Sequence, residues 1–401
     1  MKKYTPLYFL GALGAGGLAV SFFMYFQFLI KHETPMVTFN HIFATFKDSD
    51  FLTKILIILV ILGILAFAFL HIKLLIWNVK RYLKFKNSEE YKKIVNTSKE
   101  ISLMALPLTL AMSINVGFIL GAVFVPNLWN FVEYLFPFAL IAFLIVGYYA
   151  LKIFLDYFAR MLLEGKFDFA ENNSLSQMIA VFAFSMVGVG LAAPAAMSHN
   201  KIVATIALFF SLFFLSIAGI LTLIKLTLGF KSMLEKGVNK DTSASLWIVI
   251  PILTLFGISM FRQSHGIAHH LVHQNYTTSG FFILASIILS LQIFFGILGY
   301  MVMKKFNYFK DYVYGDKKSP GSLALICPGV AFFVFGFFFI FFGLVKNGIL
   351  PENPKIISIA LLPLIYIQYK TIKIFFTLYK KLFTENHTRK FPICDSEINS
   401  V

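Results

Sequence analysis

A cysteine beside a proline, inside a long apolar run, is the first feature of this sequence that could do chemistry. Cys327 and Pro328 lie within residues 319–345, which read SPGSLALICPGVAFFVFGFFFIFFGLV. This uncharged run is long enough to cross the roughly 30 Å hydrocarbon core of a bilayer as a helix. Pro328 has no N–H, so the carbonyl of Ala324 loses its helical partner, which a membrane tolerates only beside protein or a water-filled space. We therefore expect this run to line a passage through the membrane.

The side chains around the proline suggest how narrow that passage is. Eight phenylalanines lie between residues 332 and 342, and we expect Phe332 and Phe335 to form a constriction together with Cys327. A thiolate there could attack or coordinate a sulfur, selenium or soft-metal species. The alternative is that the thiol is a small buried apolar group without reactivity.

A second candidate is the segment RQSHGIAHHLVH, residues 262–273. His265, His269 and His273 are spaced by four and fall on one face of a helix, as in helical zinc or copper sites. They could also respond to pH, or form a solvated vestibule without a specific role. Arg262 is the only basic residue of this segment, and we expect it with His265 and His269 at an outer mouth that attracts anions. The alternative for Arg262 is an interfacial residue whose charge reaches water.

Weakly polar side chains and helix-breaking residues recur in the apolar runs. Small residues let helix backbones approach closely, and sparse hydroxyl and amide groups give a lumen that passes an anion without holding it. The candidates for lining the passage are Ser113, Asn115, Gly188, Gly190, Pro194 and Pro251.

The composition places these candidates in a membrane. Of 401 residues, 58% are hydrophobic and 13% are charged, about half the charged fraction of a soluble domain. The net charge of +16 does not indicate nucleic-acid binding, because the basic residues gather at the ends of apolar runs. We find no acidic pair within a run, no phosphate-binding loop and no catalytic motif, so we expect neither an enzyme nor a resident cofactor.

Ten runs are expected to cross the membrane as helices, within residues 1–383, and residues 384–401 form a polar tail. The ten are residues 7–30, 52–77, 101–125, 129–153, 176–197, 202–225, 245–270, 279–303, 320–345 and 355–380. The segment before the first run and the ends of the even runs carry 28 of the 35 Lys and Arg residues. The positive-inside rule then predicts that both termini are cytoplasmic.

Glycine and proline are unevenly distributed among these runs. The odd runs hold 19 of them and the even runs hold 8. Because slender and broken helices line cavities in transporters, we expect five hairpins whose odd helices form an inner ring around a central pore. Ordinary helix packing is the alternative explanation, since both residues are common in membrane helices.

This pattern resembles the tellurite-resistance/dicarboxylate transporter family, which includes the slow-type anion channels of plants. The resemblance rests on ten spans in five hairpins and on the soft motifs GALGAGGLA, GVGLAAP and SLALICPG. It implies a pore enclosed by the odd helices, a trimer, and a phenylalanine gate in the ninth span. Cys327 stands at the matching position, which favours a thiol-dependent variant and is similar to the bacterial TsoY branch, whose members carry Cys or selenocysteine. Arg262 and the histidines have no counterpart in the family motif.

The sequence therefore predicts an all-helical channel or transporter of a bacterial inner membrane that carries a small solute, and an anion is the solute that we expect. A carrier of sulfur or selenium species that uses a pore thiol is one alternative. A membrane redox or metal-binding protein that uses His265, His269 and His273 is another, and a sensor or scaffold without transport is a third.

Overall fold

The computed structural model describes residues 4–95, 97–164, 174–272 and 279–384. In these residues the chain is helical and has no strand, and ten helical segments are long and apolar enough to cross a membrane. The all-α, multi-pass membrane fold is therefore confirmed. The segments are Pro6–Leu29, Phe51–Lys86, Ser98–Phe124, Val132–Leu163, Ser176–Met197, Lys201–Lys236, Ser243–His270, Ser279–Lys305, Pro320–Val345 and Pro354–Thr384.

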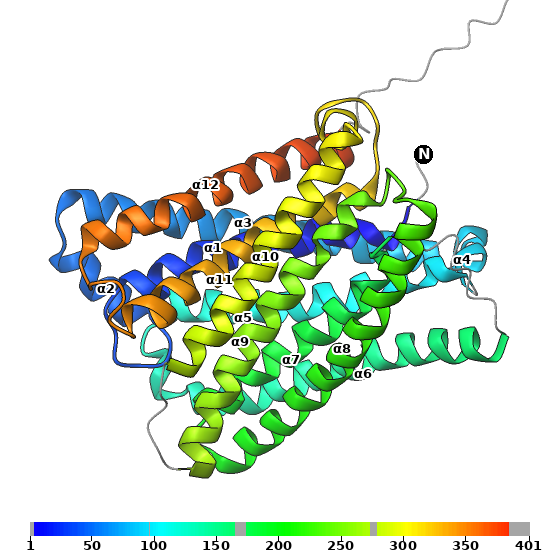
Figure 1. Cartoon of the computed structure of the whole chain (residues 1–401). Helices are drawn as coiled ribbons and strands as arrows, with labels where there is room; N and C mark the ends of the chain where they lie inside the picture. Colours follow the sequence, from blue (N-terminus) through cyan, green and yellow to red (C-terminus); the bar gives the residue numbers. More distant parts are fainter. Residues whose placement is uncertain (1–3, 96, 165–173, 273–278, 385–401) are drawn as a thin grey trace, which may run out of the picture.

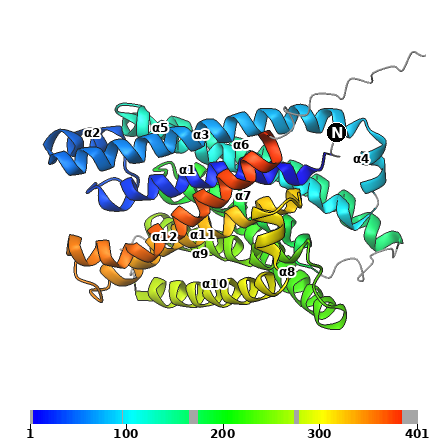
Figure 2. The same ribbon diagram turned by 90° about the horizontal axis from the view of Figure 1, so that it is seen from above.

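The elements form one bundle of long helices packed side by side (Figures 1 and 2). The odd spans contain α1 (Phe9–Leu29), α5 (Ala105–Phe124), α7 (Ile179–Met197), α9 (Val249–Ile267) and α11 (Ile326–Phe338). The even spans contain α3 (Phe51–Lys86), α6 (Val132–Glu164), α8 (Lys201–Lys236), α10 (Ser279–Lys305) and α12 (Pro354–Tyr379). We call the first set the inner helices and the second the outer helices.

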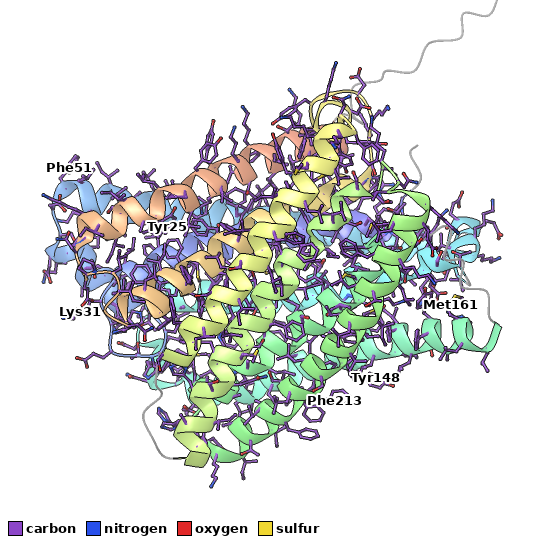
Figure 3. All side chains as sticks on the ribbon, viewed as in Figure 1. Tyr25, Lys31, Phe51, Tyr148, Met161 and Phe213 are labelled. Atoms are coloured by element: carbon purple, nitrogen blue, oxygen red, sulfur yellow. The ribbon has the colours of Figure 1, made fainter. Side chains whose placement is uncertain are left out.

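Burial separates the two sets. In the most apolar 18-residue stretch of each span, 61–94% of residues are buried in the inner helices and only 28–39% in the outer helices. Each inner helix packs against the next, and α11 packs against α1, so that the five close into a ring. Outer side chains such as Tyr148 and Phe213 are exposed on the bundle surface (Figure 3), where they can meet lipid.

Buried polar side chains of the outer helices fasten them to the ring. Gln292 of α10 donates to the Thr254 hydroxyl of α9 at 2.7 Å, and that hydroxyl donates to the Ala331 carbonyl of α11 at 3.0 Å. Gln368 of α12 bonds to Ser21 of α1 at 2.9 Å. A lone amide in hydrocarbon is costly, so each such pair holds an outer helix in register with the ring.

Every inner helix begins in the same way. A 3₁₀ segment precedes it, at Pro6–Tyr8, Ser98–Met104, Ser176–Met178, Ser243–Ile248 and Pro320–Leu325. In α5, α9 and α11 the third α-helical residue is a proline, respectively Pro107, Pro251 and Pro328. A proline is well tolerated in a first turn. We expected Pro328 to break the helix in the middle of the span. The structure instead changes from 3₁₀ to α geometry between Leu325 and Ile326, and Pro328 lies in the first turn of α11.

The two ends of the bundle differ. Both ribbon views place α4 (Glu89–Ile94) and the N-terminus at one end and α2 (Phe39–Asp48) at the other. The end that carries α4 also receives the Lys-rich segments, and we call it the Lys-rich end. Lys31 and Phe51 lie at the opposite end (Figure 3), which we call the base-poor end. The sequence pattern did not predict α2, which lies in the connection between the first two spans.

Candidate functional site: a central cavity

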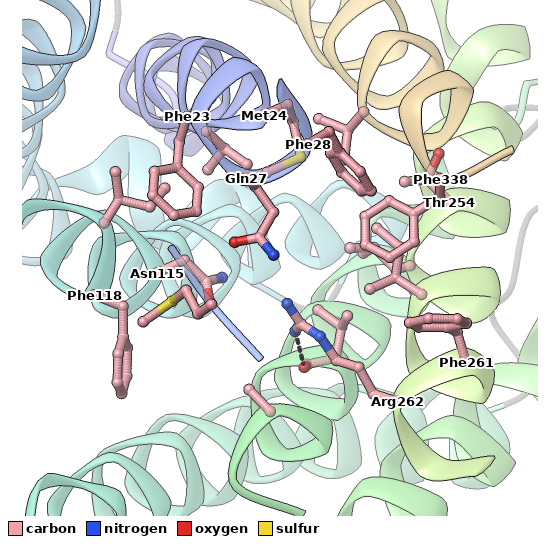
Figure 4. A pocket seen from close by; sticks show the side chains of 18 of the residues that line it. Phe23, Met24, Gln27, Phe28, Asn115, Phe118, Thr254, Phe261, Arg262 and Phe338 are labelled. Carbon is pink, nitrogen blue, oxygen red and sulfur yellow. Dashed lines mark hydrogen bonds between the residues drawn. The ribbon is translucent and has the colours of Figure 1, made fainter. Parts of the chain in front are cut away.

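The ring of inner helices encloses a cavity of about 630 Å³. All five inner helices line it, together with residues of the two connections at the base-poor end. Among those connection residues, Lys31, Pro35, Lys346 and Glu352 are exposed, so the cavity opens at that end. Most of its wall is apolar and aromatic, with Phe23, Phe28, Phe118, Phe261 and Phe338 prominent in the wall (Figure 4).

A single guanidinium group points into this cavity. Arg262 of α9 lines the cavity, and its Nη1 donates to the Val189 carbonyl of α7 at 3.2 Å (Figure 4). Among the described residues, no acidic side chain forms an ion pair with it. A guanidinium has five N–H donors, so one bond to a carbonyl leaves most of its donor capacity directed at the cavity.

Two carboxamides project toward the same space. Gln27 of α1 and Asn115 of α5 point toward the Arg262 guanidinium in Figure 4. Gln27 is held in place because its Nε2 donates to the Pro35 carbonyl at 3.2 Å and its Oε1 accepts from the Val37 N–H at 3.1 Å. The arrangement offers one full positive charge, one fixed amide dipole at Gln27 and one adjustable amide dipole at Asn115, a combination that suits an anion.

A second cavity of about 120 Å³ lies at the other end of the ring. It is lined by the 3₁₀ segments and the residues beside them, including Ser176, Thr242, Ser245 and Ser319. Three residues border both cavities: Phe182, Pro251 and Cys327. These three side chains, from α7, α9 and α11, therefore form the partition between the two spaces.

Several residues that the sequence suggested do line the large cavity. They are Asn115, Gly190, Pro251, Arg262, His265 and Cys327. Gly190 is required by close packing, because a Cβ there would overlap the ring of Phe143. Pro194 lies inside α7 and removes the N–H that would bond the Gly190 carbonyl. That carbonyl is thus freed where the helix borders a cavity, as the bilayer requires.

Phe332 and Phe335 do not line either cavity, which corrects the expected constriction. The cavity-lining residues of α11 are Cys327, Val330, Ala331, Val334 and Phe338. At 3.6 residues per turn, Phe332 lies about 140° around the helix from Cys327 and Phe335 about 80°, so Phe332 points away from this face and Phe335 lies at its edge. Phe335 is fully buried, and a Cβ at Gly257 would overlap its ring, so it packs between α9 and α11.

Ser113, Gly188, Pro194 and Pro328 are also absent from the cavity walls. The hydroxyl of Ser113 lies 2.9 Å from Nε2 of His71, on the side that faces α3. The carbonyl of Gly188 accepts from the Ser211 hydroxyl of α8 at 2.7 Å. Ser113 and Gly188 therefore serve contacts between inner and outer helices, which was the alternative explanation for small residues in the odd runs.

The histidines of the second candidate segment are divided between two surroundings. His265 lines the cavity, and its Nδ1 lies 2.9 Å from the Phe261 carbonyl. His269 is exposed, with its ring centroid 6.0 Å from that of His199 and 4.5 Å from that of His270. His273 lies outside the described residues. Among the residues that the structure does describe, no group of three His, Cys, Asp or Glu side chains could hold a metal ion.

Gln27 and Phe182 were missed by the sequence reasoning. A carboxamide near the end of an otherwise apolar first span is a signal that could have revealed Gln27. Phe182 lies six residues after the start of its span and Cys327 seven residues after the start of its own, so comparing equivalent depths would have paired them. No family model, curated protein or solved structure matches this chain.

Proposed function

We propose that this protein transports a small anion across the membrane through the central cavity, and that Arg262 binds the anion. The single observation that carries the proposal is the cavity-facing guanidinium without an acidic partner among the described residues. A charged side chain within a membrane span is costly unless it faces a partner or a water-filled cavity, and it usually marks the path of a substrate or ion. Arg262 lies within the span Ser243–His270. An anion is the partner that this site accepts.

The partition formed by Phe182, Pro251 and Cys327 is proposed as the gate. Two cavities that end on opposite sides of the same three side chains suit alternating or gated access. Phe182 contributes an aromatic ring from α7, opposite the position in α11 where the family resemblance implies a phenylalanine and this chain has Cys327. We propose membership of that family on the five-inside, five-outside helix arrangement, with a trimer and a cytoplasmic Lys-rich end in a bacterial inner membrane.

The test is anion flux into liposomes that contain the purified protein. Arg262→Gln removes the charge but keeps a polar side chain, and charge-assisted hydrogen bonds contribute about 1.5–3 kcal/mol, so flux at low anion concentration should fall at least tenfold. Lys346→Gln is the matched control, because it removes a positive charge at the exposed rim of the same cavity and should change flux less than twofold. Equal flux in Arg262→Gln and the unaltered protein would refute the proposal.

A thiol-dependent carrier of sulfur or selenium species is the second candidate. It is favoured by the position of Cys327, which borders both cavities. Cys327→Ser keeps the size of the side chain and removes the thiol. The variant should then lose transport of sulfur or selenium species and keep transport of other anions. An equal loss of transport for the two classes of solute would exclude a thiol-dependent carrier.

A further inference from the structure

The space between the partition and Arg262 is long and apolar. Pro251 at the partition and Arg262 lie eleven residues apart on α9, a rise of about 16 Å along an α-helix. The cavity wall over this length is mostly hydrocarbon, thioether and glycine. It comprises Gly17, Val20, Met112, Leu255, Ile258 and Val334.

The polar groups on this wall are few. The Thr254 hydroxyl is within 3.0 Å of the Ala331 carbonyl and accepts from Gln292 at 2.7 Å, so it is occupied within the protein. Asn115 donates only a long bond, 3.6 Å, to the Met186 sulfur. A small hydrated anion that moved below Arg262 would lose most of its water and gain only the Asn115 amide as a hydrogen-bond donor.

The charge in the cavity is also single. Lys31, Lys346 and Glu352 are the other charged residues of the wall, and they are exposed at the rim. A dianion that placed one group on Arg262 would leave its second charge among apolar side chains, which is strongly unfavourable. One anionic group and one apolar body match one guanidinium and one apolar chamber.

We propose that the substrate is an amphipathic organic monoanion, a monocarboxylate whose apolar chain lies between Arg262 and the partition. The inference rests on the proposed function and narrows its substrate class. The carboxylate accepts from the Arg262 guanidinium in the paired geometry that guanidinium and carboxylate groups favour. The chain displaces water from the wall around Ile258 and Val334. The volume of about 630 Å³ lies within the range of pockets that enclose organic ligands of this kind.

The experiment measures binding of radiolabelled octanoate to the full-length protein in lipid nanodiscs, corrected for empty nanodiscs. Unlabelled straight-chain acids from butyrate to octanoate compete. Each added methylene should tighten binding three- to fourfold, because a buried CH₂ contributes about 0.8 kcal/mol. Octanol, which lacks the charge, and suberate, which adds a second carboxylate, should compete at least tenfold more weakly than octanoate.

Two variants locate the site. Arg262→Lys keeps a positive charge and should bind octanoate more weakly than the unaltered protein but more tightly than Arg262→Gln. Val334→Phe fills the chamber below the guanidinium and should weaken octanoate at least tenfold while leaving butyrate within twofold. Because Val334→Phe must retain butyrate binding, a folding defect is distinguishable from a shortened chamber.

The outcomes separate this inference from the proposed function. Affinity that is flat with chain length, or suberate that competes as well as octanoate, would overturn the monoanion assignment. If Arg262-dependent flux of chloride or nitrate accompanied that result, anion transport would stand and only the substrate class would fall. Absence of both binding and flux for every anion would overturn both proposals.

Discussion

The two halves of the helical ring are built from the same five helices but differ in shape and chemistry. At the base-poor end the helices enclose a large, mostly aromatic and aliphatic cavity with one guanidinium. At the Lys-rich end, 3₁₀ segments and serine and threonine side chains enclose a cavity about one fifth as large. The difference teaches that each inner helix has two parts along its length, a tight collar in its first turns and a cavity wall beyond them.

The largest expected effect comes from filling the partition that separates these halves. Cys327→Phe adds a ring where three side chains already meet, so anion flux should fall to that of protein-free liposomes, whereas Cys327→Ala should raise flux. Arg262-dependent binding should persist in both variants, because the large cavity remains open at the base-poor end. Unchanged flux in both variants would show that anions do not pass between the two cavities at Cys327.

The next prediction compares a glycine of the cavity wall, Gly190, with an exposed glycine, Gly117. Gly190→Ala places a methyl group against Phe143, and overpacking of this kind costs about 1–3 kcal/mol. Gly117→Ala is the matched control, since a Cβ at Gly117 meets no atom within 4 Å and alanine is the better helix former. Thermal unfolding in detergent should show destabilisation for the first variant only, and equal melting temperatures would contradict the packing described for α7.

A smaller effect is expected at the Lys-rich end. Lys240 and Lys317 each donate to Asp311 at 2.8 Å and hold the pKa of its carboxyl at about 2. Because this pKa is lowered from near 3.9, the stabilisation is complete above pH 4 and is lost as the pH falls toward 2. Melting temperature measured from pH 6 to pH 2 should fall for the unaltered protein, and Asp311→Asn should lack that component. If melting temperature fell equally with pH in Asp311→Asn and in the unaltered protein, the ion pairs of Asp311 would contribute nothing to stability.

The smallest effect concerns α2 at the base-poor end. The Nδ1 of His41 accepts from the Thr38 N–H at 3.1 Å, and burial, with His32 nearby, lowers the pKa of His41. A lowered histidine pKa means that the neutral form caps the helix, so this stabilisation is present above about pH 6.5 and is lost on acidification. The protection factor of the amides at the start of α2, which compares the measured exchange rate with the intrinsic rate at each pH, should fall as the pH is lowered from 7.5 to 5.5.

His41→Gln is the control for that measurement. Glutamine at this position of a capping box can accept the same N–H without titrating, so exchange in the variant should not gain a pH dependence beyond that of free amides. If exchange in the variant did gain such a pH dependence, titration of the neighbouring His32, and not of the capping His41, would be its cause.

The fold was predictable from the sequence because it follows from hydropathy, charge and residue size. Apolar length located all ten spans, although α3, α6 and α8 continue nine to eleven residues beyond the predicted ends of their runs. The excess of glycine and proline in the odd runs identified the inner helices, since small residues are needed where helices pack on all sides. The helix α2 was not predictable as a span, being short and amphipathic in a connection.

The site was only partly predictable because a cavity depends on helix rotation. Arg262 and Cys327 stood out as a charge and a thiol in apolar runs, and both border the cavity. Phe335 could not be placed, because one residue of difference from Val334 turns a side chain by about 100°. Phe182 is one of 49 phenylalanines, and only its contact with both cavities distinguishes it.

The hydrogen bonds between the first and last spans have a consequence for biogenesis. Ser21 and Tyr25 find their partner in Gln368, more than 340 residues later in the chain. Until the final hairpin has been synthesised and inserted, the wall of the chamber has a gap and these hydroxyls lack their partner amide. Closure of the helical ring is therefore coupled to completion of translation, and a product truncated before the final hairpin would leave the cavity open on one side.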